Sequence, residues 1–153
     1  MQGTGGPGAE PRGRRPLGRE GVLPLRYRYR PPVSLGEFEE MLGRLLDEIP
    51  DVLLEGLNGG VIIEPQGRPS REAPGMLVLG EYHHTPHLGR FIVLYYGSFV
   101  HTAGSSRRRW EEEMRATLRH ELRHHVEDRA GLRDLEREDR EAIRRYLEGS
   151  DRG

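Results

Sequence analysis

Residues 115–140 read RATLRHELRHHVEDRAGLRDLEREDR, and this stretch decides how the rest of the chain is interpreted. Its first half continues an apolar pattern at helical spacing, which predicts one long helix over residues 106–129. The helix carries the motif HExxH, formed by His120, Glu121 and His124. Residues four apart share one side of a helix, so both imidazoles can bind a single zinc ion. Glu121 is then placed to act as general base on a water that the metal activates.

The other predicted helices lie on both sides of this one. Ser34 and Glu37 have the spacing of a capping box, so a helix should begin after Ser34 and end at Pro50. Glycine at position 131 fits the end of the HExxH helix. With that helix included, helices are expected at residues 35–50, 51–57, 106–129 and 135–147.

Short strands are expected between the helices, separated by stretches rich in Pro and Gly. They are predicted at residues 60–64, 76–82 and 91–100. Residues 83–90 contain three histidines and are predicted to form a turn, with a second metal site as a weaker hypothesis. The order of elements predicts an α+β fold, in which a small sheet of about three to four strands packs on helices.

The first residues differ in composition from the rest of the chain. Residues 1–20 hold six Gly and three Pro and show no hydrophobic period, so they are predicted to be a disordered tail rich in Arg. Residues 21–150 are expected to form a single domain, since 153 residues are enough for one hydrophobic core. Cysteine is absent, which excludes disulfides, thiol nucleophiles and zinc sites built from Cys.

Charge and hydropathy restrict the classes of partner that the protein is expected to have. No apolar run approaches the roughly 18 residues of a membrane span, and no signal peptide is recognisable, so we expect a cytoplasmic protein without a membrane partner. All 24 basic residues are Arg, and the net charge is −1. Short basic tails are commonly just solvated, so we do not expect nucleic acid as a partner. No sequence feature indicates an oligomeric state.

A resemblance extends these predictions. The segment IVLYYGSFV at residues 92–100, followed by residues 115–140, is similar to the small bacterial zincin-like metallopeptidase family, also called minimal zincins. The resemblance extends over residues 33–147 and implies a compact α+β zincin-like fold with zinc as cofactor. It assigns His120 and His124 as zinc ligands and Glu121 as the catalytic base.

The third ligand departs from the family pattern. In that pattern a glycine follows the second His by three residues and an acid follows three later, but here Glu127 occupies the glycine position. The first glycine is Gly131, about one helical turn further on. The chain needs about two extended residues to return over that distance, which favours Glu136 as third ligand. Asp134 is the alternative, although it could instead cap the last helix.

Asp139 shares the apolar side of the last helix, where an acid usually has a buried partner. It is predicted either to orient a ligating His by accepting its free N–H or to pair with an Arg.

Two functions follow as hypotheses. The first is a zinc metallopeptidase that hydrolyses a peptide or protein substrate, with the strand at residues 91–100 as the edge along which an extended peptide lies. The alternative is a catalytically weak or inactive zincin-fold protein with a binding or regulatory role. The displaced third ligand keeps this alternative open, as do Arg119 and Arg123, which would oppose a cation if they pointed at it.

Overall fold

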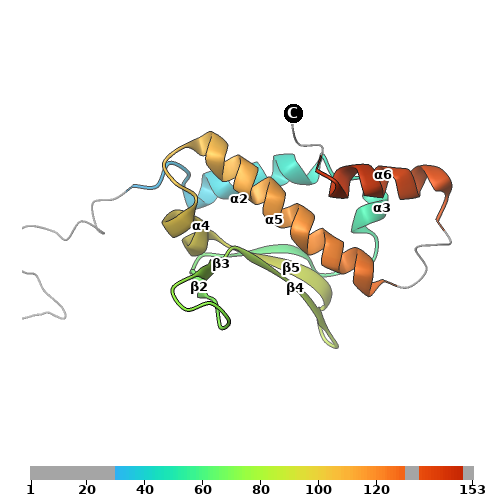
Figure 1. Ribbon diagram of the computed structural model, residues 1–153, viewed down its shortest axis with the longest axis horizontal. Helices are drawn as coiled ribbons and strands as arrows, with labels where there is room; N and C mark the ends of the chain where they lie inside the picture. The colour runs from blue at the N-terminus through green and yellow to red at the C-terminus, as the bar shows by residue number, and fades with distance from the viewer. Residues whose placement is uncertain (1–29, 130–134, 150–153) are drawn as a thin grey trace, which may run out of the picture. The chain divides into compact units, whose positions relative to one another are not determined.

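The computed structural model describes residues 30–129 and 135–149. Contacts divide the chain into units Met1–Pro31 and Pro32–Gly153, and the second unit carries all the elements that follow. Its helices are α2 (Leu35–Leu46), α3 (Asp51–Leu54), α4 (Tyr96–Thr102), α5 (Arg107–Asp128) and α6 (Arg137–Leu147) (Figure 1). Its strands are β1 (Gly60–Glu64), β2 (Arg68–Pro69), β3 (Leu77–Val78), β4 (Gly80–Thr85) and β5 (Gly89–Tyr95). The predicted tail over residues 1–20, and the predicted domain start at residue 21, lie outside the described residues.

The fold class is α+β, as predicted. A three-stranded sheet has the order β1-β5-β4, with β1 parallel and β4 antiparallel to β5, and a separate two-stranded sheet pairs β2 with β3. Helix α5 crosses one face of the three-stranded sheet, and α2 lies behind α5 in this view (Figure 1). No helix in the described part of the chain is long and apolar enough to cross a membrane.

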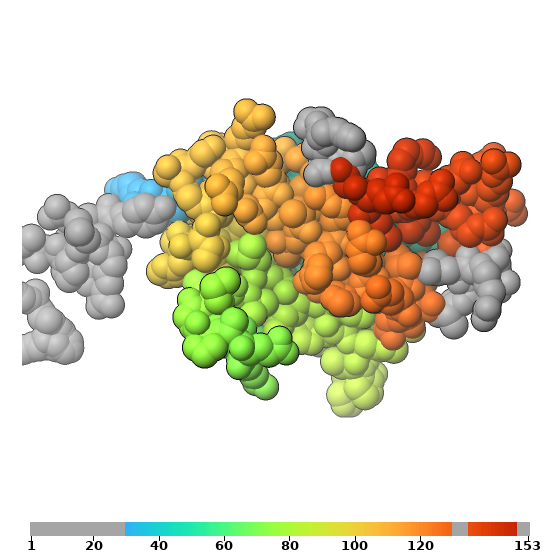
Figure 2. All heavy atoms as spheres, in the orientation of Figure 1, coloured from blue at the N-terminus to red at the C-terminus, as the bar shows by residue number. Residues whose placement is uncertain are grey.

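The position of β5 corrects one prediction. Because β5 pairs with β1 on one side and with β4 on the other, it is the central strand and offers no edge to a peptide. The edge that lies next to α5 belongs to β4, and the two elements are neighbours in the space-filling view (Figure 2).

Helix α2 begins where its sequence predicts. The backbone N–H of Ser34 donates to Glu37 at 2.9 Å, and the Ser34 hydroxyl accepts from the Glu37 backbone at 3.1 Å, which completes the capping box. Its apolar side then packs against α4 and α5, where Phe38 contacts the rings of Tyr96, Phe99 and Trp110. This cluster fixes the first turns of α5 against the rest of the core.

Two predicted boundaries are wrong. Residues 96–100 do not continue the preceding strand but lie in α4, because Tyr96 and Phe99 are three apart and pack into the core from one side of a helix. His83, His84 and Thr85 do not form a turn but belong to β4, and only residues 86–88 make the turn. Strand β4 therefore continues further along α5 than predicted and includes two of the histidines.

Candidate functional site

The orientation of α5 is set by its buried residues. The Ser106 hydroxyl accepts the Arg109 backbone N–H at 3.2 Å and so caps the helix. Four apolar side chains, one in every turn, are then completely buried: Trp110, Met114, Leu118 and Leu122. With this side in the core, Glu121 faces β4, while His120 and His124 lie on the solvent-exposed side of the helix.

The predicted pair of imidazoles is adjacent in the structure. The ring centroids of His120 and His124 are 4.9 Å apart and the rings are perpendicular. Their side chains are 66% and 50% exposed, so solvent and ligands can reach both. The Nδ1 atom of His124 lies 3.6 Å from an Oε of Glu127, too long for a hydrogen bond but close enough for an attraction between charges.

Glu121 occupies a different environment from its two neighbours. It is only 7% exposed, and its Oε2 atom lies 4.0 Å from His120 Nε2. Burial raises the pKa of Glu121 to about 7, and the nearby Glu81 carboxylate adds to that rise. A hydrogen bond from the backbone of Tyr82 acts in the opposite direction and ties Glu121 to the edge strand. A buried carboxyl group with a pKa near neutrality is common where acid–base chemistry takes place.

A groove of about 700 Å³ runs between α5 and β4 and exposes these groups to solvent. Glu121, His124, Glu127 and Asp128 line it from the helix, and residues 80–84 line it from the strand. Gly80 makes the close approach possible, because a Cβ atom at this position would lie 2.7 Å from a methyl group of Thr117.

The strand side of the groove is the open edge of the sheet. The Tyr95 N–H donates to the Leu79 carbonyl at 2.9 Å, and the same register pairs residues 81 and 83 with β5. In an antiparallel pair, the residues in between turn their N–H and C=O groups outward. Those residues are Gly80, Tyr82 and His84, so their backbone groups face the open side of β4.

Asp128 joins the end of α5 to the strands and is a residue that the sequence patterns did not single out. Its Oδ2 atom accepts hydrogen bonds from Tyr82 Oη at 2.9 Å and from Arg90 Nε at 3.0 Å, and it lies 2.8 Å from His84 Nδ1. The hydrogen bonds from Arg90 and then Tyr82 hold the pKa of Asp128 below its usual range. The signal was present in the sequence, because Asp128 lies seven residues after Glu121 and therefore on the same side of the helix.

The hypothesis of a second metal site formed by the three histidines of residues 83–90 is not supported. His83 and His84 are consecutive in β4, so their side chains point to opposite faces. His83 stacks on Phe91 with centroids 5.0 Å apart, and its Nε2 lies 3.2 Å from Glu81. His87 is exposed in the turn. His83 and His84 both line the groove, but the ring of one contacts Phe91 and Glu81 and the ring of the other contacts Asp128.

His125 is a packing residue. It is completely buried, with Nε2 2.8 Å from the Glu55 carbonyl oxygen and Nδ1 3.1 Å from the Tyr82 hydroxyl. Burial lowers its pKa, so the neutral imidazole is the favoured form. The two consecutive histidines therefore differ: His124 faces the groove and His125 holds α5 against α3 and β4.

The two arginines that could have opposed a cation lie outside the groove lining. The guanidinium of Arg123 donates to the Leu147 carbonyl at the end of α6, so it points toward that helix. Arg119 is close enough to lower the pKa of Tyr146, which also belongs to α6. Neither side chain therefore supplies an argument against a metal at His120 and His124.

The residues present fit two ligand positions of a zinc ion. His120 and His124 bring two imidazole nitrogen donors together on one side of a helix, which is the donor chemistry that zinc prefers. Within residues 30–129 and 135–149, however, no group of three or more His, Cys, Asp or Glu side chains is placed to hold a metal.

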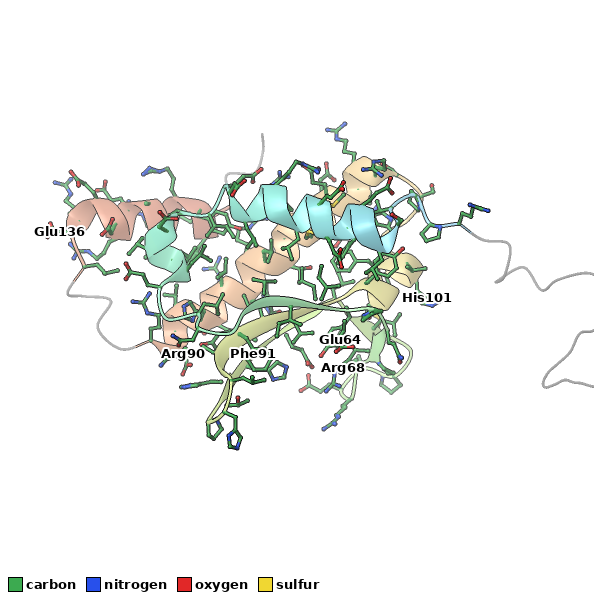
Figure 3. The ribbon with its side chains drawn as sticks, turned by 180° about the vertical axis from the view of Figure 1, so that it is seen from behind. Glu64, Arg68, Arg90, Phe91, His101 and Glu136 are labelled. Carbon is green, nitrogen blue, oxygen red and sulfur yellow. The ribbon has the colours of Figure 1, made fainter. Side chains whose placement is uncertain are left out.

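The third ligand and the role of Asp139 remain predictions. Glu136 is exposed at the start of α6, at the outer end of that helix (Figure 3). Asp134 lies outside the described residues. Asp139 is half-buried in the first turn of α6.

Comparisons with known proteins give a relative but no activity. No protein-family model and no curated protein matches the chain. A solved structure described as a conserved hypothetical protein from Thermo thermophilus is 39% identical, with a TM-score of 0.55. The match covers 61% of this chain and 94% of that one. At this identity over nearly the whole of the relative, the chain belongs to the same family as that conserved hypothetical protein.

Proposed function

We propose that the protein is a zinc-dependent peptidase in which Glu121 acts as the general base. One observation carries the proposal: a buried carboxyl group and the imidazole of His124 line a groove whose other wall is an open strand edge, and the ring of His120 lies beside that of His124. Hydrolysis of an extended peptide needs all three features. The strand edge would hold the peptide, a metal on the imidazoles would polarise its carbonyl group, and the carboxyl group would activate the attacking water.

His120 and His124 would hold the ion, together with an acid from the segment that follows α5, with Glu136 as the preferred residue. When bound, zinc supplies Lewis acidity, which makes water more acidic and polarises a carbonyl group. The absence of Arg from the groove lining favours a cation at this position.

Glu121 would take a proton from the attacking water and pass it to the departing amine nitrogen. A base works best when its pKa lies near the operating pH, and burial raises the pKa of Glu121 to about 7. Its link to the Tyr82 backbone holds the carboxyl group at the strand edge, where the substrate carbonyl has to lie.

The substrate would be an extended segment of polypeptide. The outward-facing backbone groups of Gly80 and His84 and the carbonyl of Tyr82 are those that a further strand pairs with, while the Tyr82 N–H donates to Glu121. A peptide paired with β4 would lie in the groove and pass Glu121 and His124.

The test compares the wild-type protein with Glu121→Gln on a broad library of unstructured peptides, after zinc loading. Glutamine keeps the size of the side chain but cannot accept the proton, so the variant should hold zinc and lose hydrolysis by a factor of about 10² or more. If both proteins hold zinc and neither cleaves any peptide, catalysis is ruled out and the zincin-fold binding protein becomes the better account. Equal residual cleavage by both proteins would indicate a contaminating protease.

A further inference from the structure

His84 stands at the groove in a fixed orientation that the acid–base chemistry of Glu121 does not use. It lines the groove from β4 with its side chain half exposed, and its Nδ1 atom lies 2.8 Å from Asp128 Oδ2. An ionised carboxylate can only accept, so this contact is favourable when Nδ1 carries a proton. The ring nitrogen left for a ligand is therefore Nε2.

The partner of His84 is itself held in place. Asp128 also accepts from the Tyr82 hydroxyl and from Arg90, and these donors come from β4 and β5. Two hydrogen bonds on one carboxylate leave it little freedom to rotate, and the imidazole in contact with it is positioned in turn. His83 also lines the groove, but its ring contacts Phe91 and Glu81 rather than Asp128.

The position of His84 along β4 agrees with this orientation. It is two residues beyond Tyr82, whose backbone meets Glu121, so both residues turn the same side to α5 and both have outward-facing backbone groups. A peptide paired with the open edge would thus have Glu121 and His84 on the same stretch of strand.

We infer that His84 is a further catalytic residue: as the imidazolium, with Nδ1–H toward Asp128, it donates a hydrogen bond from Nε2–H to the substrate carbonyl oxygen, and Asp128 is its positioning residue. The inference rests on the proposed function. When water attacks, its oxygen bonds to the carbonyl carbon, Glu121 takes the proton, and the π electrons of the carbonyl move onto its oxygen. The Nε2–H of His84 stabilises the negative charge on that oxygen. The C–N bond then breaks, and the nitrogen leaves with its electron pair and takes the proton from Glu121.

The test measures kcat and KM of the zinc-loaded protein and of His84→Gln and His84→Asn, on a peptide that the wild type cleaves. A hydrogen bond made mainly in the transition state should appear in kcat, so we expect a loss of about 10²-fold in kcat with KM nearly unchanged. His87→Gln is the matched control, since His87 lies three residues further along the same hairpin and is not among the residues lining the groove. Zinc content and melting temperature establish that each variant is folded and loaded.

A second measurement does not need turnover. A phosphinic peptide mimics the tetrahedral, negatively charged state, and its affinity should fall by about tenfold or more in both His84 variants while His87→Gln keeps it. If the wild type cleaves peptides but the His84 variants match it in kcat and in phosphinate affinity, the inference is overturned and the peptidase stands. If the wild type cleaves nothing but binds the phosphinate through His84, the peptidase fails and the role of His84 in anion recognition stands. If the wild type neither cleaves nor binds the phosphinate, both are overturned.

Discussion

Two histidine pairs lie on the neighbouring elements α5 and β4, and their secondary structure decides what each can do. His120 and His124 are four residues apart on a helix, and their rings meet with centroids 4.9 Å apart. His83 and His84 are consecutive in a strand, and they separate to opposite faces, one onto Phe91 and the other onto Asp128. Only the pair whose sequence spacing matches the helical period is therefore brought together in space.

The comparison predicts its largest effect in metal content. His120→Ala and His124→Ala should each lose the roughly one zinc ion per chain that the wild type carries, because each removes one of two adjacent donors. His83→Ala should keep the ion, since its ring contacts Phe91 and Glu81. Elemental analysis of protein purified without chelators measures this. Equal zinc in all these proteins would remove the metal site and the distinction between the pairs.

The third ligand gives the next largest effect. If Glu136 completes the site, Glu136→Gln should weaken zinc affinity far more than Asp134→Asn, because an amide oxygen is a poorer ligand for zinc than a carboxylate. Competition with a chromophoric chelator measures both affinities. The reverse order would assign the role to Asp134.

A pH-dependent stability effect should separate Glu121 from the histidines beside it. Burial raises the pKa of Glu121 from 4.5 to about 7, so the folded protein favours its protonated form. The contribution of Glu121 to the stability of the metal-free wild type should therefore be most favourable below the unfolded pKa of 4.5, fall as the pH rises to about 7, and level off above that. Glu121→Gln removes this loss and should stabilise the metal-free protein by up to about 3 kcal/mol at about pH 8. Urea unfolding at acid and alkaline pH measures it, and a variant less stable than wild type at alkaline pH would contradict the prediction.

Consecutive histidines on α5 should differ in their effect on folding. His125→Ala leaves the Glu55 carbonyl without its partner, removes one of the two contacts of the Tyr82 hydroxyl and opens a cavity, so it should cost about 2 kcal/mol or more. His124→Ala in metal-free protein should change stability by less than about 0.5 kcal/mol, because its ring is at the surface. The free energy of unfolding of the two variants, measured side by side, checks this. Similar losses would mean that His124 also holds the fold together.

The smallest effect is expected on the outer face of β4. His83→Ala removes a stacked ring from Phe91 and should cost about 1 kcal/mol without changing zinc content. Thermal unfolding of the variant, with His87→Ala as an exposed control, measures the difference. A loss as large as that of His125→Ala would show that the outer face of the sheet is as important to stability as the core.

The sequence by itself determined the elements whose signals are local. Ser34 and Glu37 placed the start of α2, because a capping box forms within four residues. The spacing of Trp110, Met114 and Leu118 placed α5 with its buried side, and this in turn fixed which side His120 and His124 occupy. The α+β class followed from the order of these elements.

Only the tertiary structure decided which strand forms the edge and which polar groups meet there. Strand order depends on contacts between residues far apart in the chain, and no local pattern distinguished the central β5 from the edge strand β4. The approach of Asp128 to His84, Tyr82 and Arg90 arises because α5 crosses the sheet at that point. In the same way, the raised pKa of Glu121 is a property of its burial against β4. The sequence could name the residues of the motif, but the environment that gives them their chemistry exists only once helix and strand pack together.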